Sequence, residues 1–478
     1  MARNEKFRVE SLLKNQPWLL PAIILVCGFL LYAPTLQHHF IYDDNWTIVQ
    51  NPAIKQLFPL SRFFLDGTTS ALPQSGIPQD VYRPLSTLSF AVNFAVGGLT
   101  PGSYRVVNIL LHLFSGLLLW RILSRRFSPF ASGVGALLFL LHPIQVESVV
   151  WVTQRSILLC AAATLLCLDF WDRSFQKPVY GWAAVGAYGL ALLGKETAIG
   201  LPFLLFLCPP PPAGGERKHQ DQFWFFISGF VLTALLYLVL RFQVLGHLRQ
   251  EIARQATLGS SLQEGMSALW IYGRNLLWPF HLNVSISWPE TLSWSSPSVL
   301  VGVAVMVFAG VSAVFTWRRG SVLFLAAALP MAFFAPHLGF IPLVTYAADR
   351  FFYMPMIGAA VATAWIAEKV RFKWILILLL GFFSLMTVVR GRAWQSEIAL
   401  WASSLRENPQ SAFSRACYAQ ALLMNGRLNE ARDQFELSLA SRPTINLARM
   451  VLQQLVQLSE KTGDTPARKR WEKELGRL

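Results

Sequence analysis

Charged side chains are scarce in this sequence. Asp, Glu, Lys and Arg make up only 14% of its 478 residues, whereas hydrophobic residues make up 54%, and the mean hydropathy is +0.43. Soluble globular chains carry about 25% charged residues. This scarcity excludes a soluble protein and predicts an integral membrane protein.

Cysteine is also rare, and its placement gives no sign of a metal site. The chain has five cysteines. Four of them, Cys27, Cys160, Cys167 and Cys208, fall in apolar stretches, and Cys417 stands alone further along. The absence of any CxxC pair excludes a cysteine-based zinc site and a disulfide framework.

Apolar windows of about 17 to 20 residues, long enough to cross a ~30 Å hydrocarbon core, recur along most of the chain. They predict an all-α polytopic protein with about eleven transmembrane helices. The predicted spans are residues 18–36, 104–124, 129–146, 155–171, 179–194, 197–208, 223–242, 297–316, 321–336, 350–368 and 373–390. The first span lacks a small-residue cleavage site, so we expect it to remain as an anchor.

The net charge of +15 does not point to nucleic acid, because the basic residues gather in alternate loops. Arg121, Arg125 and Arg126 form one such group, and Arg318 and Arg319 form another. This positive-inside pattern predicts a cytoplasmic N-terminus, and an odd number of spans then predicts an extracytoplasmic C-terminus.

This topology gives a membrane domain, residues 1–391, with two long extracytoplasmic loops at 37–103 and 243–296. Each loop contains an apolar stretch that is too short or too interrupted to cross the bilayer, Pro84 to Gly98 and Leu262 to Phe280. We expect both stretches to be helices that lie at the membrane interface.

Residues 392–478 follow a different pattern, with apolar residues at helical spacing. Three residues recur 34 positions later: Trp401, Ser404 and Pro409 recur as Phe435, Ser438 and Pro443. Thirty-four residues is the tetratricopeptide period. The pattern predicts a short extracytoplasmic repeat-like helical domain, which is too small to be an independent solenoid and is expected to lean on the membrane domain.

Two adjacent carboxylates, Asp43 and Asp44, follow the first span. A pair of acids in a partly buried site can supply one base of raised pKa or a metal ligand. The alternative is that one of them N-caps a short helix through Trp46 and Ile48. Both are candidate catalytic residues. Two carboxylates could hold a divalent cation, but no recognisable ligand spacing demands one, so no metal site is assigned and the use of a divalent cation stays open.

A second charged cluster, His142, Glu147 and Arg155, follows the third span. If this stretch is one helix, Glu147, Trp151 and Arg155 share a face at i, i+4 and i+8. Charges at membrane depth usually mark function. The alternative is a structural Glu147–Arg155 pair.

Two further pairs of charges, Lys195 with Glu196 and Asp349 with Arg350, lie at span boundaries and pose the same choice. All of these charged sets are predicted to lie on the extracytoplasmic side. Independent structural pairs would have no reason to gather there, so we expect them to share one cavity.

The charged residues fall within an ordered series of motifs. The series is Phe40-Ile41-Tyr42-Asp43-Asp44, Asn51-Pro52-x-Ile54, Tyr82-Arg83-Pro84-Leu85, Arg105-Val106-Val107-Asn108-x-x-Leu111-His112, His142-Pro143-x-x-Val146-Glu147, Gly194-Lys195-Glu196-Thr197 and Asp349-Arg350-Phe351-x-Tyr353-x-Pro355. In this order, and with the C-terminal repeats, the series resembles the transmembrane and tetratricopeptide-repeat (TMTC) O-mannosyltransferases and their bacterial relatives. The resemblance covers nearly the whole chain.

The resemblance implies a GT-C fold, a polyprenyl-phosphate sugar donor, with mannose as the expected sugar, and an extracytoplasmic acceptor. A protein acceptor bound through the tail would fit. Eukaryotic members carry long repeat arrays, whereas this tail has little more than one unit. The difference suggests a bacterial relative, in the bacterial inner membrane rather than the endoplasmic reticulum, and leaves the acceptor open.

A mechanism combines the resemblance with the residues. Polyprenyl phosphate leaves as a stable anion, so the acceptor hydroxyl needs a base, for which Asp43 and Asp44 are the candidates. The candidate phosphate ligands are Arg83, Arg155 and Arg350, with Lys195 behind them. The candidate supporting or sugar-binding residues are His142, Glu147, Glu196, Asp349 and Tyr353. Direct attack by the acceptor oxygen would invert the anomeric centre, as the resemblance also implies.

Two other classes of function stay open. A repeat-bearing membrane scaffold, or an inactive relative of the enzymes, would tolerate loss of both aspartates. A transporter would place its charges near the bilayer midplane and often shows two repeated halves, which the hydropathy does not reveal.

Overall fold

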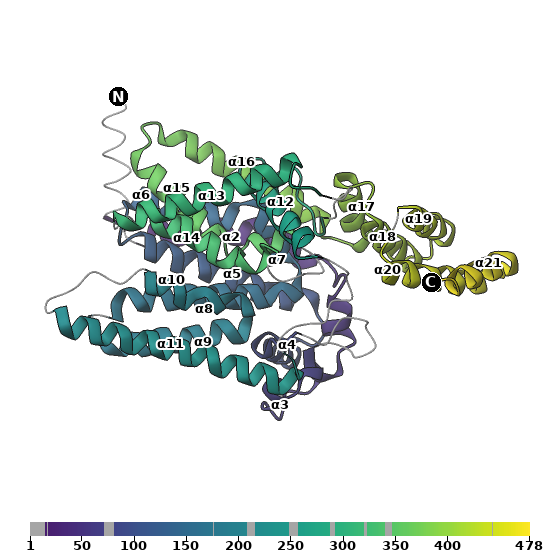
Figure 1. The fold of residues 1–478 in the computed structure, drawn as a ribbon, viewed down its shortest axis with the longest axis horizontal. Coiled ribbons are helices and arrows are strands. Elements are labelled where there is room, and N and C mark those ends of the chain that lie inside the picture. The colour runs from purple at the N-terminus through teal and green to yellow at the C-terminus, as the bar shows by residue number, and fades with distance from the viewer. Residues whose placement is uncertain are drawn as a thin grey trace.

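The computed structural model describes residues 15–16, 18–70, 81–174, 176–207, 216–247, 257–286, 292–319, 323–339, 347–441 and 443–478. Within these ranges the chain is helical and contains no β-strand (Figure 1). The prediction of an all-α protein is therefore confirmed.

Six helices in the described ranges are long and apolar enough to cross a membrane. They are Leu19–Gln37 (α2, Leu19–Tyr32, with η1, Ala33–Gln37), α5 (Pro101–Leu123), Val152–Ser174 (η7, Val152–Gln154, with α8, Arg155–Ser174), Gln220–Leu245 within α11 (Glu216–Leu245), α13 (Pro297–Arg318) and α16 (Lys373–Ala393). Only 17% of the apolar window in α13 is buried inside the protein. A surface this apolar needs lipid around it, so the chain is a multi-pass membrane protein.

A bent pair of helices is either a seventh, broken span or a re-entrant loop. Helix α6 (Pro129–Leu141) continues after a 46° bend into Pro143–Val150, which comprises η6 (Pro143–Gln145) and α7 (Val146–Val150). At the bend, Pro143 has no backbone N–H with which to continue the helix. The backbone N–H of the next residue, Ile144, donates to the His142 side chain at 3.2 Å.

Shorter helices occupy the four remaining predicted spans. They are α9 (Pro178–Gly194), η8 with α10 (Glu196–Gly200 and Leu201–Leu207), α14 with η9 (Leu323–Phe334 and Ala335–His337), and α15 (Met356–Lys369), which follows η10 (Asp349–Phe352). The longest of these, α9, has 17 residues, which is the lower limit for a full crossing, and the others are shorter. The count of eleven spans therefore stays a prediction.

Several of these helices begin at a proline, which is favoured in the first helical turn because its missing N–H would have no partner there. Pro101 begins α5, Pro178 begins α9 and Pro297 begins α13. These prolines fix where the apolar helices start, and so where the connecting segments lie.

The described parts of the two long loops form helices at the end of the bundle that carries the tail (Figure 1). Both stretches that were predicted to be interfacial helices are helical. The first loop holds η2 (Asn45–Val49), η3 (Pro52–Lys55), α3 (Arg62–Leu65), η4 (Gly67–Ser70) and α4 (Pro84–Gly97), and the second holds α12 (Leu258–Leu277).

The tail contains five described helices. They are α17 (Glu397–Glu407), α18 (Ala412–Met424), α19 (Leu428–Ala440), α20 (Ile445–Lys461) and α21 (Thr465–Leu475). Phe435 and Trp471 share an apolar core with Ala431, whereas Trp401 is buried in the core of the membrane domain. The first tail helix thus packs with the membrane helices. The assignment to the tetratricopeptide class stays a prediction.

Helices α12 and α13 approach closely at Gly302. A Cβ atom at this position would lie 1.7 Å from Met266 O of α12, whereas a Cβ atom at Gly310, further along α13, would meet nothing within 4 Å. The backbone carbonyl of Met266 cannot move aside as a flexible side chain would, so only glycine fits at this contact.

We predict that Gly302→Ala separates α12 from α13 and lowers the unfolding temperature of the purified protein in detergent, because overpacking costs about 1–3 kcal/mol. Gly310→Ala is the matched control in the same helix and should not lower it. A Gly302→Ala variant as stable as the wild type would contradict the close approach.

Candidate functional site

The acidic motif lies in a tight turn just after the first span. Tyr42 has a φ of 52°, a left-handed conformation that costs a non-glycine residue about 1–3 kcal/mol. Its backbone N–H donates to Glu397 Oε1 of α17 at 2.9 Å, and its ring lies between Trp151 and Trp401, with centroids 5.4 and 5.1 Å away. The tail thus helps to hold the strained turn.

Asp44 is buried, and both of its carboxylate oxygens accept hydrogen bonds. One carboxylate oxygen accepts from Thr153 N at 2.9 Å and Thr153 Oγ1 at 2.6 Å, and the other accepts from Ile41 N at 3.3 Å. Burial raises the pKa of Asp44 to about 6, although the hydrogen bonds from Thr153 oppose that rise. Its side chain makes no N-terminal cap on η2, so the capping alternative is wrong for Asp44.

Asp43 lies beside it and differs in its contacts. Its residue is partly exposed, and no hydrogen-bond donor among the described residues reaches its carboxylate. Burial raises the pKa of Asp43 to about 7, with the positive charge of Arg350 lowering it and the negative charge of Asp44 raising it. Of the two aspartates, Asp43 is the one whose carboxylate has no hydrogen-bond donor in the described part of the chain.

Arg350 pairs with Glu147. Its Nη1 donates to Glu147 Oε1 at 2.6 Å and to Val284 O at 3.0 Å, and its guanidinium lies 5.5 Å from the Trp151 ring centroid. Glu147 is fully buried, whereas 16% of the Arg350 side chain is exposed. Within the described chain Nε and Nη2 of Arg350 have no acceptor.

Arg155 does not pair with Glu147. Helix α7 ends at Val150, Trp151 is extended and α8 begins at Arg155, so the three residues predicted to share one helical face do not do so. Arg155 is wholly buried. Its acceptors are Asn108 Oδ1 at 2.9 Å, Ser89 O at 3.2 Å, Ser89 Oγ at 3.4 Å, Asn93 Oδ1 at 2.9 Å and Tyr104 O at 2.8 Å.

A second cationic group lies beside Arg350. Arg83 makes a bidentate contact with Glu196, at 2.8 and 3.3 Å. Lys195 Nζ lies 5.9 Å from the Phe351 ring centroid, and the Arg350 guanidinium lies 4.7 Å from the same centroid. Burial, followed by the charge of Arg83, lowers the pKa of Lys195 to about 7. Lys195 and Arg350 thus both lie at the Phe351 ring, and the charge of Arg83 acts on Lys195.

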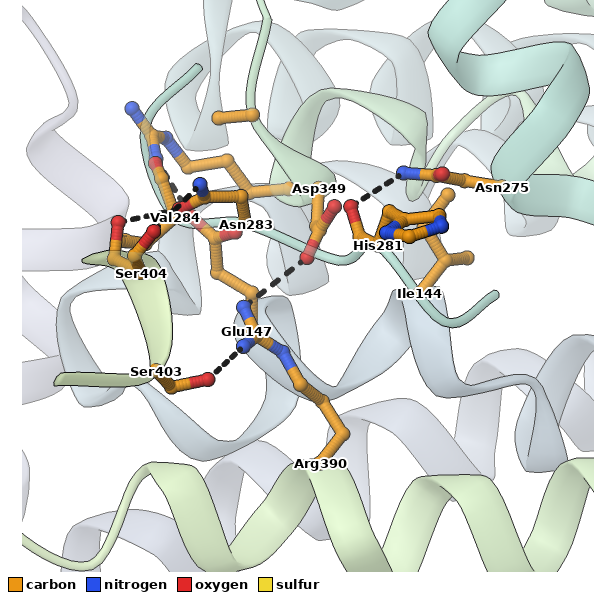
Figure 2. Close-up of polar contacts among 12 residues, drawn as sticks. Ile144, Glu147, Asn275, His281, Asn283, Val284, Asp349, Arg390, Ser403 and Ser404 are labelled. Atoms are coloured by element: carbon orange, nitrogen blue, oxygen red, sulfur yellow. Dashed lines mark hydrogen bonds and ion pairs between the residues drawn. The ribbon is translucent and has the colours of Figure 1, made fainter. Parts of the chain in front are cut away.

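Asp349 pairs with Arg390 at the end of α16, at 3.2 Å (Figure 2). Arg390 also donates to Ser403 Oγ of α17 at 3.4 Å. The Asp349 backbone N–H donates to Asn283 O at 3.4 Å. Asp349 therefore joins α16, α17 and the loop before α13.

Two of the predicted residues lie in the protein interior and hold helices together. Tyr353 hydroxyl bonds His112 Nδ1 at 2.7 Å. His142 accepts from Ile144 N through Nδ1, so its Nε2 carries the proton and donates to Leu276 O at 3.1 Å. Neither contact reaches the acidic turn.

The sequence did not single out Thr153, Glu397 or Arg390 as members of this site. Thr153 lies in η7 and Arg390 in α16, outside the ordered motifs, and neither belongs to a local pattern that indicates a site. Glu397 lies 355 residues from its partner Tyr42. Only long-range information would have found these contacts. For a metal, the described residues contain no group of three or more His, Cys, Asp or Glu side chains placed to hold an ion.

The chain is similar to known mannosyltransferases. A profile of the family described as dolichyl-phosphate-mannose-protein mannosyltransferase matches residues 84–240, from α4 to α11. Protein O-mannosyl-transferase Tmtc1 of Drosophila melanogaster is 33% identical over 199 residues, 40% of this chain and 23% of the fly protein. Protein O-mannosyl-transferase TMTC2 of Mus musculus is 33% identical over 186 residues, 36% of this chain and 22% of the mouse protein.

A third relative, protein O-mannosyl-transferase TMTC4 of Mus musculus, is 30% identical over 203 residues, 37% of this chain and 27% of that protein. The resemblance to the TMTC-like proteins that the ordered motifs indicated is therefore confirmed. The matched part of the chain spans about a quarter of the length of each of these relatives. The profile match includes Glu147, Arg155 and Lys195 but not Asp43 or Arg350.

We predict that Arg155→Leu lowers the unfolding temperature by several degrees, because each buried acceptor left without its donor costs about 1–3 kcal/mol. Arg427→Leu on the tail removes a contact with Glu430 in which both side chains are about half exposed and should change stability by less than about 1 kcal/mol. Thermal unfolding in detergent compares the two variants. An Arg155→Leu protein with wild-type stability would show that the guanidinium is not a structural anchor.

Proposed function

We propose that this chain is a glycosyltransferase of the mannosyltransferase type. It transfers a sugar, with mannose as the first candidate, from a polyprenyl-phosphate donor to a hydroxyl of a protein or other extracytoplasmic acceptor. One observation carries the proposal: at the exit of the first span, the Asp43 carboxylate, of raised pKa, and two nitrogens of the nearby Arg350 have no hydrogen-bond partner in the described part of the chain. Similarity to named O-mannosyltransferases supports the sugar and the reaction class.

In this proposal Asp43 is the base. The acceptor oxygen attacks the anomeric carbon, its proton passes to Asp43, and the bond from that carbon to the phosphate oxygen breaks. Attack on the face opposite the phosphate inverts the anomeric centre. A base works best when its pKa lies near the working pH, and a carboxyl with a pKa of about 7 meets that condition.

Asp44 has a supporting role in the proposal. It holds Thr153 and the Ile41 backbone, and its charge raises the pKa of Asp43. Two neighbouring carboxyls in different surroundings can thus serve different purposes.

The lipid phosphate is assigned to Arg350, with Lys195 and Arg83 beside it. Arginine suits phosphate because its planar guanidinium can donate two parallel hydrogen bonds. Glu147 and Glu196 orient Arg350 and Arg83. Arg155 was also a candidate phosphate ligand, but its five contacts inside the protein lead us to assign it to holding α4, α5 and α8 together.

The remaining assignments follow from the predicted topology. The site, the two long loops and the tail lie on the extracytoplasmic side, and the N-terminus lies in the cytoplasm. Residues 1–391 form the GT-C-like membrane domain, and residues 392–478 form the repeat-like domain that a protein acceptor would contact. His142, Asp349 and Tyr353 support the fold around the site. Whether a divalent cation assists is decided by assaying transfer with and without a chelator.

We predict that Asp43→Asn abolishes sugar transfer but leaves insertion, stability and lipid-phosphate binding intact, because Asn keeps the size of Asp but cannot accept the proton. General-base catalysis contributes about 10²–10⁴-fold, so a loss of that size is expected. Asp44→Asn is the matched control, since it replaces a hydrogen-bonded neighbour. It should lower stability, because its amide would face the Ile41 N–H. Near-normal turnover by Asp43→Asn would eliminate Asp43 as the base.

The pH dependence tests the same residue. Asp43 must be deprotonated to act, so the transfer rate should rise with pH up to about 7 and level off above it. The groups whose charges act on Asp43 are Arg350 and Asp44. A rate that is flat between about pH 5 and 8 would contradict a base with this pKa.

We predict that Arg350→Leu weakens binding of a short-chain polyprenyl phosphate by at least about tenfold, because a charged hydrogen bond contributes about 1.5–3 kcal/mol. Glu147 would be left buried and unpaired, so Arg350→Leu is combined with Glu147→Gln, which removes that charge. Glu147→Gln alone is the control and should bind the lipid. Normal binding by the double variant would place the phosphate elsewhere.

A further inference from the structure

The first helix of the tail contacts the acidic turn directly. Glu397 Oε1 accepts hydrogen bonds from Tyr42 N at 2.9 Å and from Asn45 Nδ2 at 3.1 Å. These two donors flank Asp43 and Asp44 in the sequence. One carboxylate oxygen therefore closes the turn that carries both acids.

The same helix also contacts the Tyr42 side chain. Trp401 follows Glu397 by one helical turn, so both residues lie on the same face of α17. Its ring is 5.1 Å from that of Tyr42 at an interplanar angle of 79°, and Trp401 is only 1% exposed. Tyr42 is thus held by its backbone and by its ring, which explains how its left-handed conformation persists.

The second tail helix lies close to Asp43 as well. The pKa of Cys417, on α18, is raised by burial and then by the negative charges of Asp43 and Glu397. Phe413, one turn earlier on α18, packs against Trp401 with ring centroids 5.8 Å apart. Helices α17 and α18 therefore flank the acidic turn.

Three contacts seat α17 independently of Glu397. Ser404 Oγ donates to Asn283 Oδ1 at 2.6 Å, Arg390 donates to Ser403 Oγ at 3.4 Å and His281 pairs with Glu407 at 2.8 Å. Figure 2 shows Ser403 and Ser404 reaching Arg390 and Asn283, respectively. Loss of the Glu397 side chain should therefore release the turn without releasing the helix.

We propose that Glu397 is a positioning residue for the transfer reaction: by accepting from Tyr42 N and Asn45 Nδ2 it fixes the turn that directs Asp43 at the acceptor hydroxyl. The first helix of the tail is then part of the active site. This inference rests on the proposed function, and it adds a residue that lies outside the ordered motifs. In this proposal the two hydrogen bonds that Glu397 accepts, rather than its negative charge, fix the turn.

The test compares Glu397→Ala with Glu397→Gln in the full-length protein. Glutamine keeps an oxygen that can accept both bonds, whereas alanine removes it. Glu407→Ala is the matched control, because it removes a carboxylate from the same helix that pairs with His281 instead of the turn. Hydrogen exchange of the peptide containing Tyr42, transfer rate against pH, and binding of a short-chain polyprenyl phosphate are measured for all three.

We expect Glu397→Ala to speed exchange of the Tyr42 amide by about fivefold or more, as the loss of one hydrogen bond would. The transfer rate should fall by at least about tenfold, since small misplacements of a reacting group are costly. The pH at which the rate reaches half of its maximum should also change. Lipid-phosphate binding should stay within about twofold of wild type, because α17 does not hold Arg83 or Lys195. Glu397→Gln and Glu407→Ala should resemble the wild type in all three measurements.

Unchanged exchange at Tyr42 in Glu397→Ala would overturn the inference, whatever the activity. So would wild-type transfer with a wild-type pH midpoint, or a Glu397→Gln variant as impaired as Glu397→Ala. Asp43→Asn is assayed in parallel to separate the two proposals. If Asp43→Asn is active, the proposed base is wrong. If it is inactive while Glu397→Ala transfers normally, only the positioning role is wrong.

Discussion

The ion pair between Glu147 and Arg350 is the interaction on which the site depends. Glu147 is fully buried, and leaving such a charge unpaired costs about 3–5 kcal/mol. The pair joins α7 to the segment before α15, and the bond to Val284 O adds the loop before α13. Its positive partner also lowers the pKa of Asp43. Without Arg350, Glu147 would lose its ion-pair partner and Asp43 would lose the positive charge that lowers its pKa.

The two aspartates show how a protein separates the roles of neighbouring acids. Asp44 accepts three hydrogen bonds and is buried, whereas Asp43 has no donor within the described structure. Hydrogen bonds stabilise the charged form of a carboxyl, and burial without them stabilises the neutral form. The left-handed Tyr42 directly precedes the two acids in this turn.

Local sequence predicted the helices well and the contacts between them poorly. Apolar periodicity located helices at every predicted span and at both interfacial stretches, because lipid demands long apolar helices. The periodicity did not predict that the helix would be interrupted by an extended Trp151. With this interruption, Arg155 bonds to Asn108 and Glu147 pairs with Arg350. The partner of Tyr42 lies 355 residues away. No local pattern encodes such a pairing. The sequence therefore predicted that the charged residues lie at one end of the bundle but did not predict which of them form pairs.

The boundary between the two predicted domains looks different once contacts are considered. Composition changes after residue 391, yet Trp394, Leu400 and Trp401 belong to the apolar core of the membrane domain. A separate core, containing Phe435 and Trp471, is formed mainly by the later helices. A sequence boundary marks where the chain leaves the lipid, whereas a structural boundary lies where few contacts cross. By that criterion α17 belongs with the membrane helices, and a partner bound to the later helices would be linked to the acidic turn through α17 and α18.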